Sequence, residues 1–111
     1  MAMKRKAPSA PAGLGQRARE WWRKMQAEYA VVDAGGLALL ETAARAYGRM
    51  EQARALLDKE GVTTVDRWGQ RRLHPAASVE RDSRAGLLAA LRCLHLDVEP
   101  VRDHAGRPGG R

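Results

Sequence analysis

The side chains best suited to chemistry are cations, and they are concentrated at the start of the chain. Residues 1–24 hold seven Lys and Arg against one acid, in a chain whose formal net charge is +7. Clustered Lys and Arg bind nucleic-acid phosphates, because binding releases the counterions around those phosphates. The alternative is a solvated basic leader that serves solubility alone. The predicted DNA-binding residues are Lys4, Arg5, Lys6, Arg17, Arg19, Arg23 and Lys24, with a smaller group at Arg67, Arg71 and Arg72.

Residues capable of covalent or metal chemistry do not form a recognisable group. His74, His95 and His104 are isolated from one another, and none has the spacing of a metal-ligand pair such as H-x-x-x-H. Gly35-Gly36 lacks the Lys-Ser or Lys-Thr that follows in a phosphate-binding loop. Cys93 falls on a predicted apolar helix face, where a thiol is usually inert. We therefore predict no catalytic activity, no metal and no cofactor.

The composition limits the chain to one small domain with a thin core. It has 111 residues, no Phe and only 5% aromatic residues. A single cysteine excludes an internal disulfide and fits a reducing cytoplasm. No apolar run is long enough to span a bilayer, and the first residues lack the apolar stretch of a secretory signal. We predict a soluble, cytoplasmic protein without a membrane partner.

The two ends of the chain are predicted to be unfolded. Residues 1–12 contain two prolines and few large apolar side chains, which indicates a mobile basic arm. Residues 97–111 are rich in Gly, Pro and Arg, which indicates a disordered tail. The folded domain is therefore predicted to span residues 13–96, with oligomerisation and DNA binding as its tasks.

A short first helix is predicted over residues 14–30. Leu14 and Ala18 begin a series of apolar residues at helical spacing. Trp21 and Trp22 are adjacent, so their side chains point about 100° apart and cannot both be buried in one direction. We expect one ring in the core and the other at a helix junction. The alternative is a stacking platform for single-stranded bases.

The longest predicted element is a helix over residues 36–60, capped by Asp33. Its apolar residues form a heptad-like seam of Leu39, Ala43, Ala46, Met50, Ala53 and Leu57. A second apolar line beside it consists of Leu37, Leu40, Ala44 and Tyr47. One line can meet the first and third helices, and the other is predicted to meet a neighbouring copy, the alternative being burial of both within one monomer. The predicted oligomer interface consists of the six seam residues and Trp68.

Between Gly61 and Pro75 the pattern changes from helical to extended. The β-branched run Val62–Val65 favours a strand. Asp66 and Gly69 occupy the first and fourth positions of a type I turn, which predicts a β-hairpin over residues 62–73. A lone two-stranded hairpin is barely stable in water, so we expect it to pack on another surface.

A third helix is predicted over residues 75–96. Pro75 suits a first helical turn, and His74 stands where a capping side chain belongs. The predicted fold class is therefore mainly α. It comprises a helical hairpin of one short and one long helix, a small β-hairpin and a C-terminal helix.

In order and spacing, residues of about 4–100 resemble the small subunit of phage terminases, of the kind found with siphovirus and prophage packaging modules. Two positions depart from the family pattern, because His74 stands where Asn is common and His95 where Gly is usual. Neither histidine therefore takes a functional role from the resemblance. The matching residues are Trp21-Trp22, Asp33, Leu37, Ala44, Tyr47, Gly61, Val62–Val65, Gly69, Arg71-Arg72, Pro75, the Leu87–Leu94 helix and the L-x-L close at Leu94-His95-Leu96 before Pro100.

The resemblance implies a role in viral genome packaging. Small subunits of this kind form homo-oligomeric rings, bind double-stranded viral DNA in the host bacterial cytoplasm and bring it to the terminase large subunit. The large subunit holds the ATPase and the nuclease, and the small one is non-catalytic and modulates them. A ring also multiplies weak phosphate contacts through avidity.

Two questions stay open at the level of the sequence. The hairpin either packs on a neighbouring subunit or turns Arg67, Arg71 and Arg72 towards DNA. The chain is either a ring-forming packaging adaptor, a small DNA-binding regulator that acts as a monomer or dimer, or a helical protein-interaction module whose charge is incidental. The mass in solution and the salt dependence of DNA binding separate these hypotheses.

Overall fold

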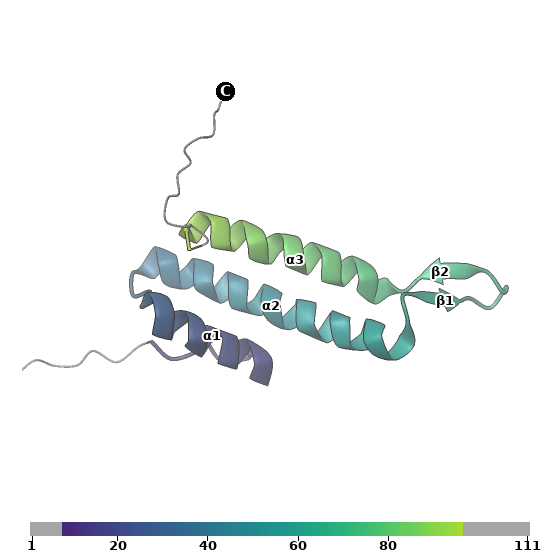
Figure 1. The fold of residues 1–111 in the computed structure, drawn as a ribbon, viewed down its shortest axis with the longest axis horizontal. Coiled ribbons are helices and arrows are strands. Elements are labelled where there is room, and N and C mark those ends of the chain that lie inside the picture. The colour runs from purple at the N-terminus through teal and green to yellow at the C-terminus, as the bar shows by residue number, and fades with distance from the viewer. Residues whose placement is uncertain (1–7, 97–111) are drawn as a thin grey trace, which may run out of the picture.

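The computed structural model of the protein describes residues 8–96, which form three helices and one antiparallel pair of strands (Figure 1). This confirms the mainly helical fold class with a small β-hairpin. Lys4, Arg5, Lys6 and the predicted tail lie outside the described residues. In chain order, the elements are α1 (Gln16–Tyr29), α2 (Ala34–Glu60), β1 (Thr63–Val65), β2 (Arg71–Leu73) and α3 (Pro75–Leu94).

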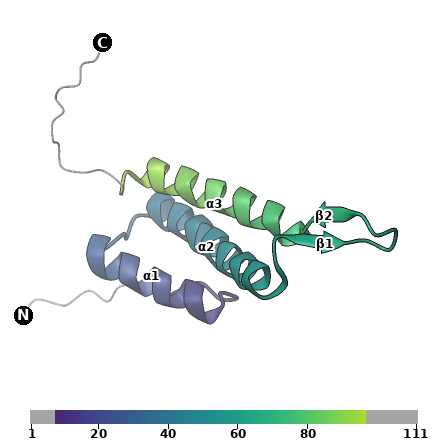
Figure 2. The ribbon, with the colours of Figure 1, turned by 45° about the vertical axis from the view of Figure 1, so that its right-hand side comes forward.

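Helix α2 lies between α1 and α3 and contacts both (Figures 1 and 2). On one side Leu40 and Ala44 are fully buried against α1 residues that include Trp22. On the other side Ala43 and Met50 pack with Leu87 of α3. No helix within residues 8–96 has both the length and the apolar character that a membrane crossing requires.

The start of α2 depends on a side-chain cap and on a glycine. Asp33 accepts a hydrogen bond from the backbone N–H of Gly36 at 2.8 Å, as its N-cap position predicts. A Cβ at Gly36 would lie 2.7 Å from Asp33 Oδ1 and 2.8 Å from Val31 Cγ1. These separations are below van der Waals contact, so only glycine fits here without displacing its neighbours.

Both apolar lines of α2 are used within one chain, which corrects part of the predicted interface between copies. The buried seam residues are Ala43, Ala46, Met50 and Ala53. Three of these four pack in one cluster with Leu87 and Ala90 of α3, so they have no surface left for a neighbour. Leu39 and Leu57 are half-buried, and Trp68 is exposed. Neither line is left open along its length, because α3 covers one line while α1 covers the other.

The hairpin has the predicted position and turn. Thr63 pairs with Leu73 and Val65 with Arg71. The Gly69 N–H donates to the Asp66 carbonyl at 3.0 Å, which closes the type I turn. Gly69 has φ +81°, a left-handed conformation that glycine adopts without strain. The prediction of a β-hairpin between two helices is confirmed.

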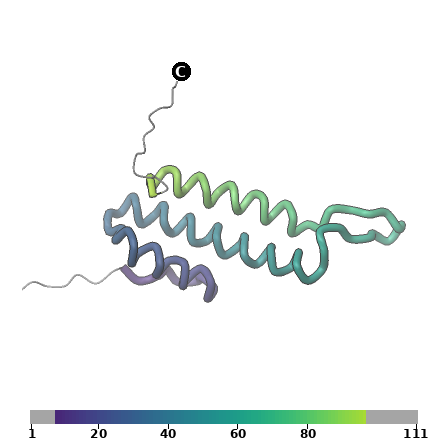
Figure 3. The backbone as a smooth tube through the Cα atoms, viewed as in Figure 1, coloured from purple at the N-terminus to yellow at the C-terminus, as the bar shows by residue number. Residues whose placement is uncertain are grey.

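The hairpin projects beyond the end of the α2–α3 pair (Figures 1 and 3). Its large apolar side chains are Val62, Val65, Trp68 and Leu73, and each is more than half exposed. Pairing places Val65 and Leu73 on one face, together with Thr63 and Arg71. The expected packing partner is therefore not supplied by the described part of the same chain.

Candidate nucleic-acid interface

The four predicted DNA-binding cations of α1 lie in different environments. Arg17 donates to Glu51 at 2.8 Å, although its side chain is largely exposed. Arg19 donates to the backbone carbonyl of Leu14 at 2.6 Å. Arg23 and Lys24 are exposed and form no hydrogen bond or ion pair with another residue in the range 8–96. Of the four, only Arg17 pairs with a carboxylate within residues 8–96, and the side chains of Arg23 and Lys24 have no partner there.

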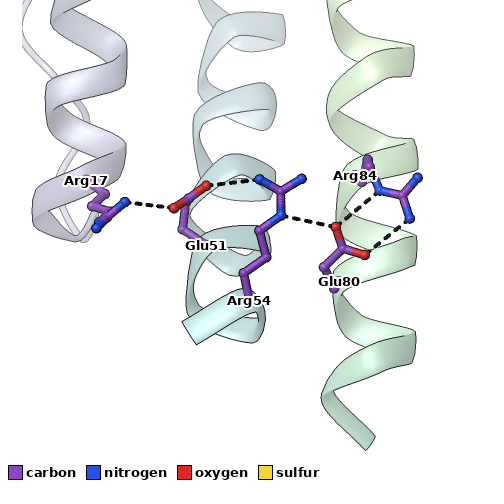
Figure 4. A network of polar contacts seen from close by, with 5 residues as sticks. All are labelled: Arg17, Glu51, Arg54, Glu80 and Arg84. Carbon is purple, nitrogen blue, oxygen red and sulfur yellow. Dashed lines mark hydrogen bonds and ion pairs between the residues drawn. The ribbon is translucent and has the colours of Figure 1, made fainter. Parts of the chain in front are cut away.

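Arg17 belongs to a chain of ion pairs that crosses all three helices (Figure 4). Glu51 on α2 lies between Arg17 and Arg54. Arg54 reaches Glu80 on α3 at 3.4 Å, and Glu80 also accepts from Arg84 at 3.1 Å. Three cations thus share two carboxylates, which ties the helices together and leaves one positive charge in excess.

These contacts also shift protonation equilibria. The hydrogen bond from Arg84, with a smaller contribution from Arg54, lowers the pKa of Glu80 below its ordinary value. The same contact raises the pKa of Arg84. Both pKa shifts favour the charged forms of Glu80 and Arg84.

Half of this network follows from local spacing in the sequence, and the other half does not. Glu80 and Arg84 are four residues apart on one helix face, and Glu51 and Arg54 are three apart. The links from Arg17 to Glu51 and from Arg54 to Glu80 cross between helices, and no local pattern indicates them.

The three arginines of the hairpin do not share one role either. Arg72 donates to Asp66 at 2.7 Å, and this hydrogen bond is the main cause of the lowered pKa of Asp66. Arg67 lies over the ring of Trp68, 4.7 Å from its centroid, in a cation–π contact. Arg71 makes only a long contact, 3.5 Å, with Thr63. Arg67 and Arg71 are therefore the hairpin cations not neutralised by a described carboxylate.

The structure does not bring the predicted cations together into one patch. Helix α1 runs beside the N-terminal half of α2, whereas the hairpin extends from the opposite end of α2 (Figures 1 and 2). One chain therefore presents two separate basic sites, with Arg23 and Lys24 at one and Arg67 and Arg71 at the other. An anion that meets both sites must be long, or must be held by more than one copy.

The two adjacent tryptophans are used for packing. Trp22 is 3% exposed and donates from Nε1 to the Pro8 carbonyl at 3.1 Å. Trp21 stacks on Tyr47 with ring centroids 5.3 Å apart and planes 14° apart. This confirms the expectation of one ring in the core and one at a helix junction. The geometry does not favour a stacking platform for bases, because Trp22 is buried and Tyr47 covers one face of Trp21.

The other residues with reactive side chains in the range 8–96 are two histidines and one cysteine. His74 accepts from the Ala76 N–H through Nδ1 at 2.9 Å, which confirms it as the cap of α3. His95 ends α3 with φ 60°. Cys93 is exposed, so the expectation of a packed thiol is wrong. Within residues 8–96, no three His, Cys, Asp or Glu residues are grouped so that they could hold a metal ion.

Comparisons with protein-family models, with curated proteins and with solved structures found no match to this chain. The residues and their geometry are therefore the basis for assigning a function. These provide free cations on α1, free cations on the hairpin and a bare apolar hairpin face.

Proposed function

We propose that this chain is the small subunit of a phage terminase. In this proposal it is a ring-forming, non-catalytic adaptor that binds double-stranded viral DNA in the host bacterial cytoplasm. It presents that DNA to a large subunit, whose ATPase and nuclease it modulates. Neither a metal nor a cofactor takes part.

The observation that carries the proposal is the division of the surface into two kinds of site. Arg23 and Lys24 on α1 are cations without a described partner, which suits contact with phosphate. Val65 and Trp68 on the hairpin are apolar and exposed, which suits contact with protein. An adaptor needs both kinds of surface. The order of residues that resembles terminase small subunits supplies the choice of this particular adaptor.

The first test is the mass of the full chain in solution, measured by light scattering with and without a DNA duplex. The proposal expects a closed oligomer of defined size that forms without DNA. A chain that stays monomeric or dimeric at tens of micromolar contradicts the packaging role.

The second test is DNA affinity as a function of salt. For the double variant Arg23→Gln/Lys24→Gln, log K should fall less steeply with log [salt]. The magnitude of the slope should decrease by about two per engaged subunit, because each lost phosphate contact contributes about one. A matched control, Arg81→Gln/Arg92→Gln, removes the same charge from exposed positions on α3 and should leave the slope within error. Equal losses in both variants would mean that net charge, rather than the α1 site, attracts DNA.

A small DNA-binding regulator is the second candidate. One observation favours it: α1 and α3 cover both apolar lines of α2, so one chain has a core of its own. A monomer or dimer that retains the salt-dependent binding of the α1 site would select this candidate over the adaptor.

A further inference from the structure

The β-hairpin contains more apolar surface than an isolated hairpin can keep in water. Val65, Trp68 and Leu73 are 65%, 69% and 55% exposed. Three-residue strands contribute few ladder hydrogen bonds, and two-stranded hairpins need a further surface for stability. Exposed apolar groups gathered on one element mark a contact with another molecule. The hairpin is therefore one half of an interface.

A hollow of matching character lies between α2 and α3, behind the base of the hairpin. Its apolar walls are Ala53 and Leu56 on α2 and Ala76 and Val79 on α3. Leu56 and Val79 are 44% and 45% exposed, so the hollow is open to solvent. Its volume is about 370 Å³. Apolar cavities of about 150 Å³ accommodate benzene, so this groove has room for an indole ring.

The hairpin cannot fill the groove of its own chain. Only His74 separates β2 from α3, and its ring is fixed on both sides, by Ala76 at 2.9 Å and by Glu60 at 2.7 Å. The His74 N–H also donates to the Val62 carbonyl at 2.6 Å, which closes the base of the hairpin. The hairpin consequently points away from the helices (Figure 3). An occupant of the groove must come from another molecule.

The charges of the two surfaces are complementary. Arg67 and Arg71 on the hairpin have no ion-pair partner in the range 8–96. Glu60, which bonds to His74 at one end of the groove, has a side chain 47% exposed. The cationic hairpin can therefore meet a carboxylate at the Glu60 end of the groove, whose lining also includes Arg49.

We propose that the hairpin of one copy docks in the α2–α3 groove of another copy, with Trp68 as the side chain that enters it. The inference rests on the assembly part of the proposed function and not on its DNA-binding part. Hairpin and groove are different surfaces, so each bound copy still presents one of each. The contact therefore repeats until it closes, as a reciprocal dimer or as a ring.

The test measures the mass of the full chain by light scattering, without DNA, for three single variants. Trp68→Gln removes the entering side chain, and Val79→Lys places in the groove a positive charge that repels the cationic hairpin. Each should weaken self-association at least tenfold. Leu88→Gln is the matched control, because Leu88 is equally exposed on α3 but lies outside the groove, and it should keep the wild-type mass. All three positions are surface positions, and far-UV circular dichroism should report the wild-type helix content.

The decisive experiment mixes the two defective variants. Trp68→Gln retains an intact groove, and Val79→Lys retains an intact hairpin. The mixture should form a one-to-one complex that grows no further, although neither variant associates alone. Val65→Gln, on the hairpin face that also carries Leu73, should behave like Trp68→Gln in the same mixture. Failure of the mixture to form this complex overturns the docking contact.

Other outcomes also overturn it and separate it from the proposed function. A monomeric wild-type chain, or a Trp68→Gln variant with unchanged mass, rules out the docking. If Trp68→Gln keeps its mass but loses affinity for a DNA duplex, the hairpin's partner is DNA. Conversely, if the variants behave as expected and the wild-type oligomer binds no DNA, the docking stands and the packaging proposal fails.

Discussion

The helical body and the β-hairpin place the same residue type in opposite environments. Trp22 in α1 is 3% exposed and uses its N–H internally, whereas Trp68 in the hairpin is 69% exposed. The body buries large apolar groups such as Trp22, Leu40 and Met50 between its own helices, whereas every large apolar side chain of the hairpin is more than half exposed. Large apolar groups stabilise a chain only where they leave water. Burial of apolar groups therefore stabilises the body within one chain, whereas the apolar groups of the hairpin can be buried only by another molecule.

The largest expected effect is the difference in stability between truncating Trp22 and truncating Trp68. Trp22→Ala should lower the free energy of unfolding by about 3–5 kcal/mol, because it leaves a cavity between α1 and α2. Trp68→Ala should change the stability of a single chain by less than about 0.5 kcal/mol. Urea unfolding followed by circular dichroism, at a concentration where the chain is monomeric, measures both. Similar losses in the two variants would erase the distinction between body and hairpin.

The joint between the two regions should show an intermediate effect. His74→Ala removes the cap of α3 and the contact with Glu60, and should cost about 1 kcal/mol. His74→Asn should recover most of this loss, because Asn caps helices well. Thermal unfolding gives the stability, and amide hydrogen exchange at Ala76 and in the strands shows where order is lost. An Asn variant as unstable as the Ala variant would place the main contribution in the contact with Glu60.

The smallest expected effect is the pH dependence of stability. It distinguishes the hairpin from the helical body, because Asp66 is hydrogen-bonded within the hairpin and Glu80 within the body. Asp66 in the hairpin and Glu80 in the body both have a pKa below their ordinary values of 3.8 and 4.5. A lowered folded pKa stabilises the folded form above the unfolded pKa, and this contribution disappears as pH falls through the folded value. Acid below about pH 4.5 should therefore weaken the body through Glu80, while protonation of Asp66 should loosen only the hairpin.

NMR titration of the side-chain carboxyl groups gives their pKa values, and urea unfolding at each pH gives the stability. Together they check this expectation. Arg84→Gln should bring the pKa of Glu80 back towards its ordinary value and flatten the acid branch of the stability curve. Arg72→Gln should do the same for Asp66 without changing that branch. A stability curve that responds equally to both variants would mean that the hairpin unfolds together with the body.

The sequence predicted the features that depend on neighbours along the chain. Asp33 and His74 were identified as caps, and Asp66 and Gly69 as a turn, because each acts on residues within four positions. The assignment of surfaces failed where contacts cross between helices. Ala43 looks available for a second copy until Leu87 of α3 is seen to cover it. Periodicity shows that a face is apolar, but it does not show what packs on that face.

The same limit applied to the candidate site. A basic excess can be counted, yet Arg17 and Arg72 are engaged by Glu51 and Asp66, while Arg23 is not engaged by a described residue. Only the geometry separates structural cations from available ones. The groove beside Val79 had no signal in the sequence, because it is formed by two helices and a single connecting residue.

The single residue between β2 and α3 has a consequence for how tightly this protein can associate. A flexible arm loses conformational entropy when it is captured, and that loss subtracts from the affinity. The imidazole of His74 is held at both nitrogens, so the hairpin has few orientations to give up. Its binding face is thus preorganised before any encounter. Because the hairpin is already ordered when the chain folds, binding does not have to pay the entropy cost of ordering it, and less of the contact free energy is lost.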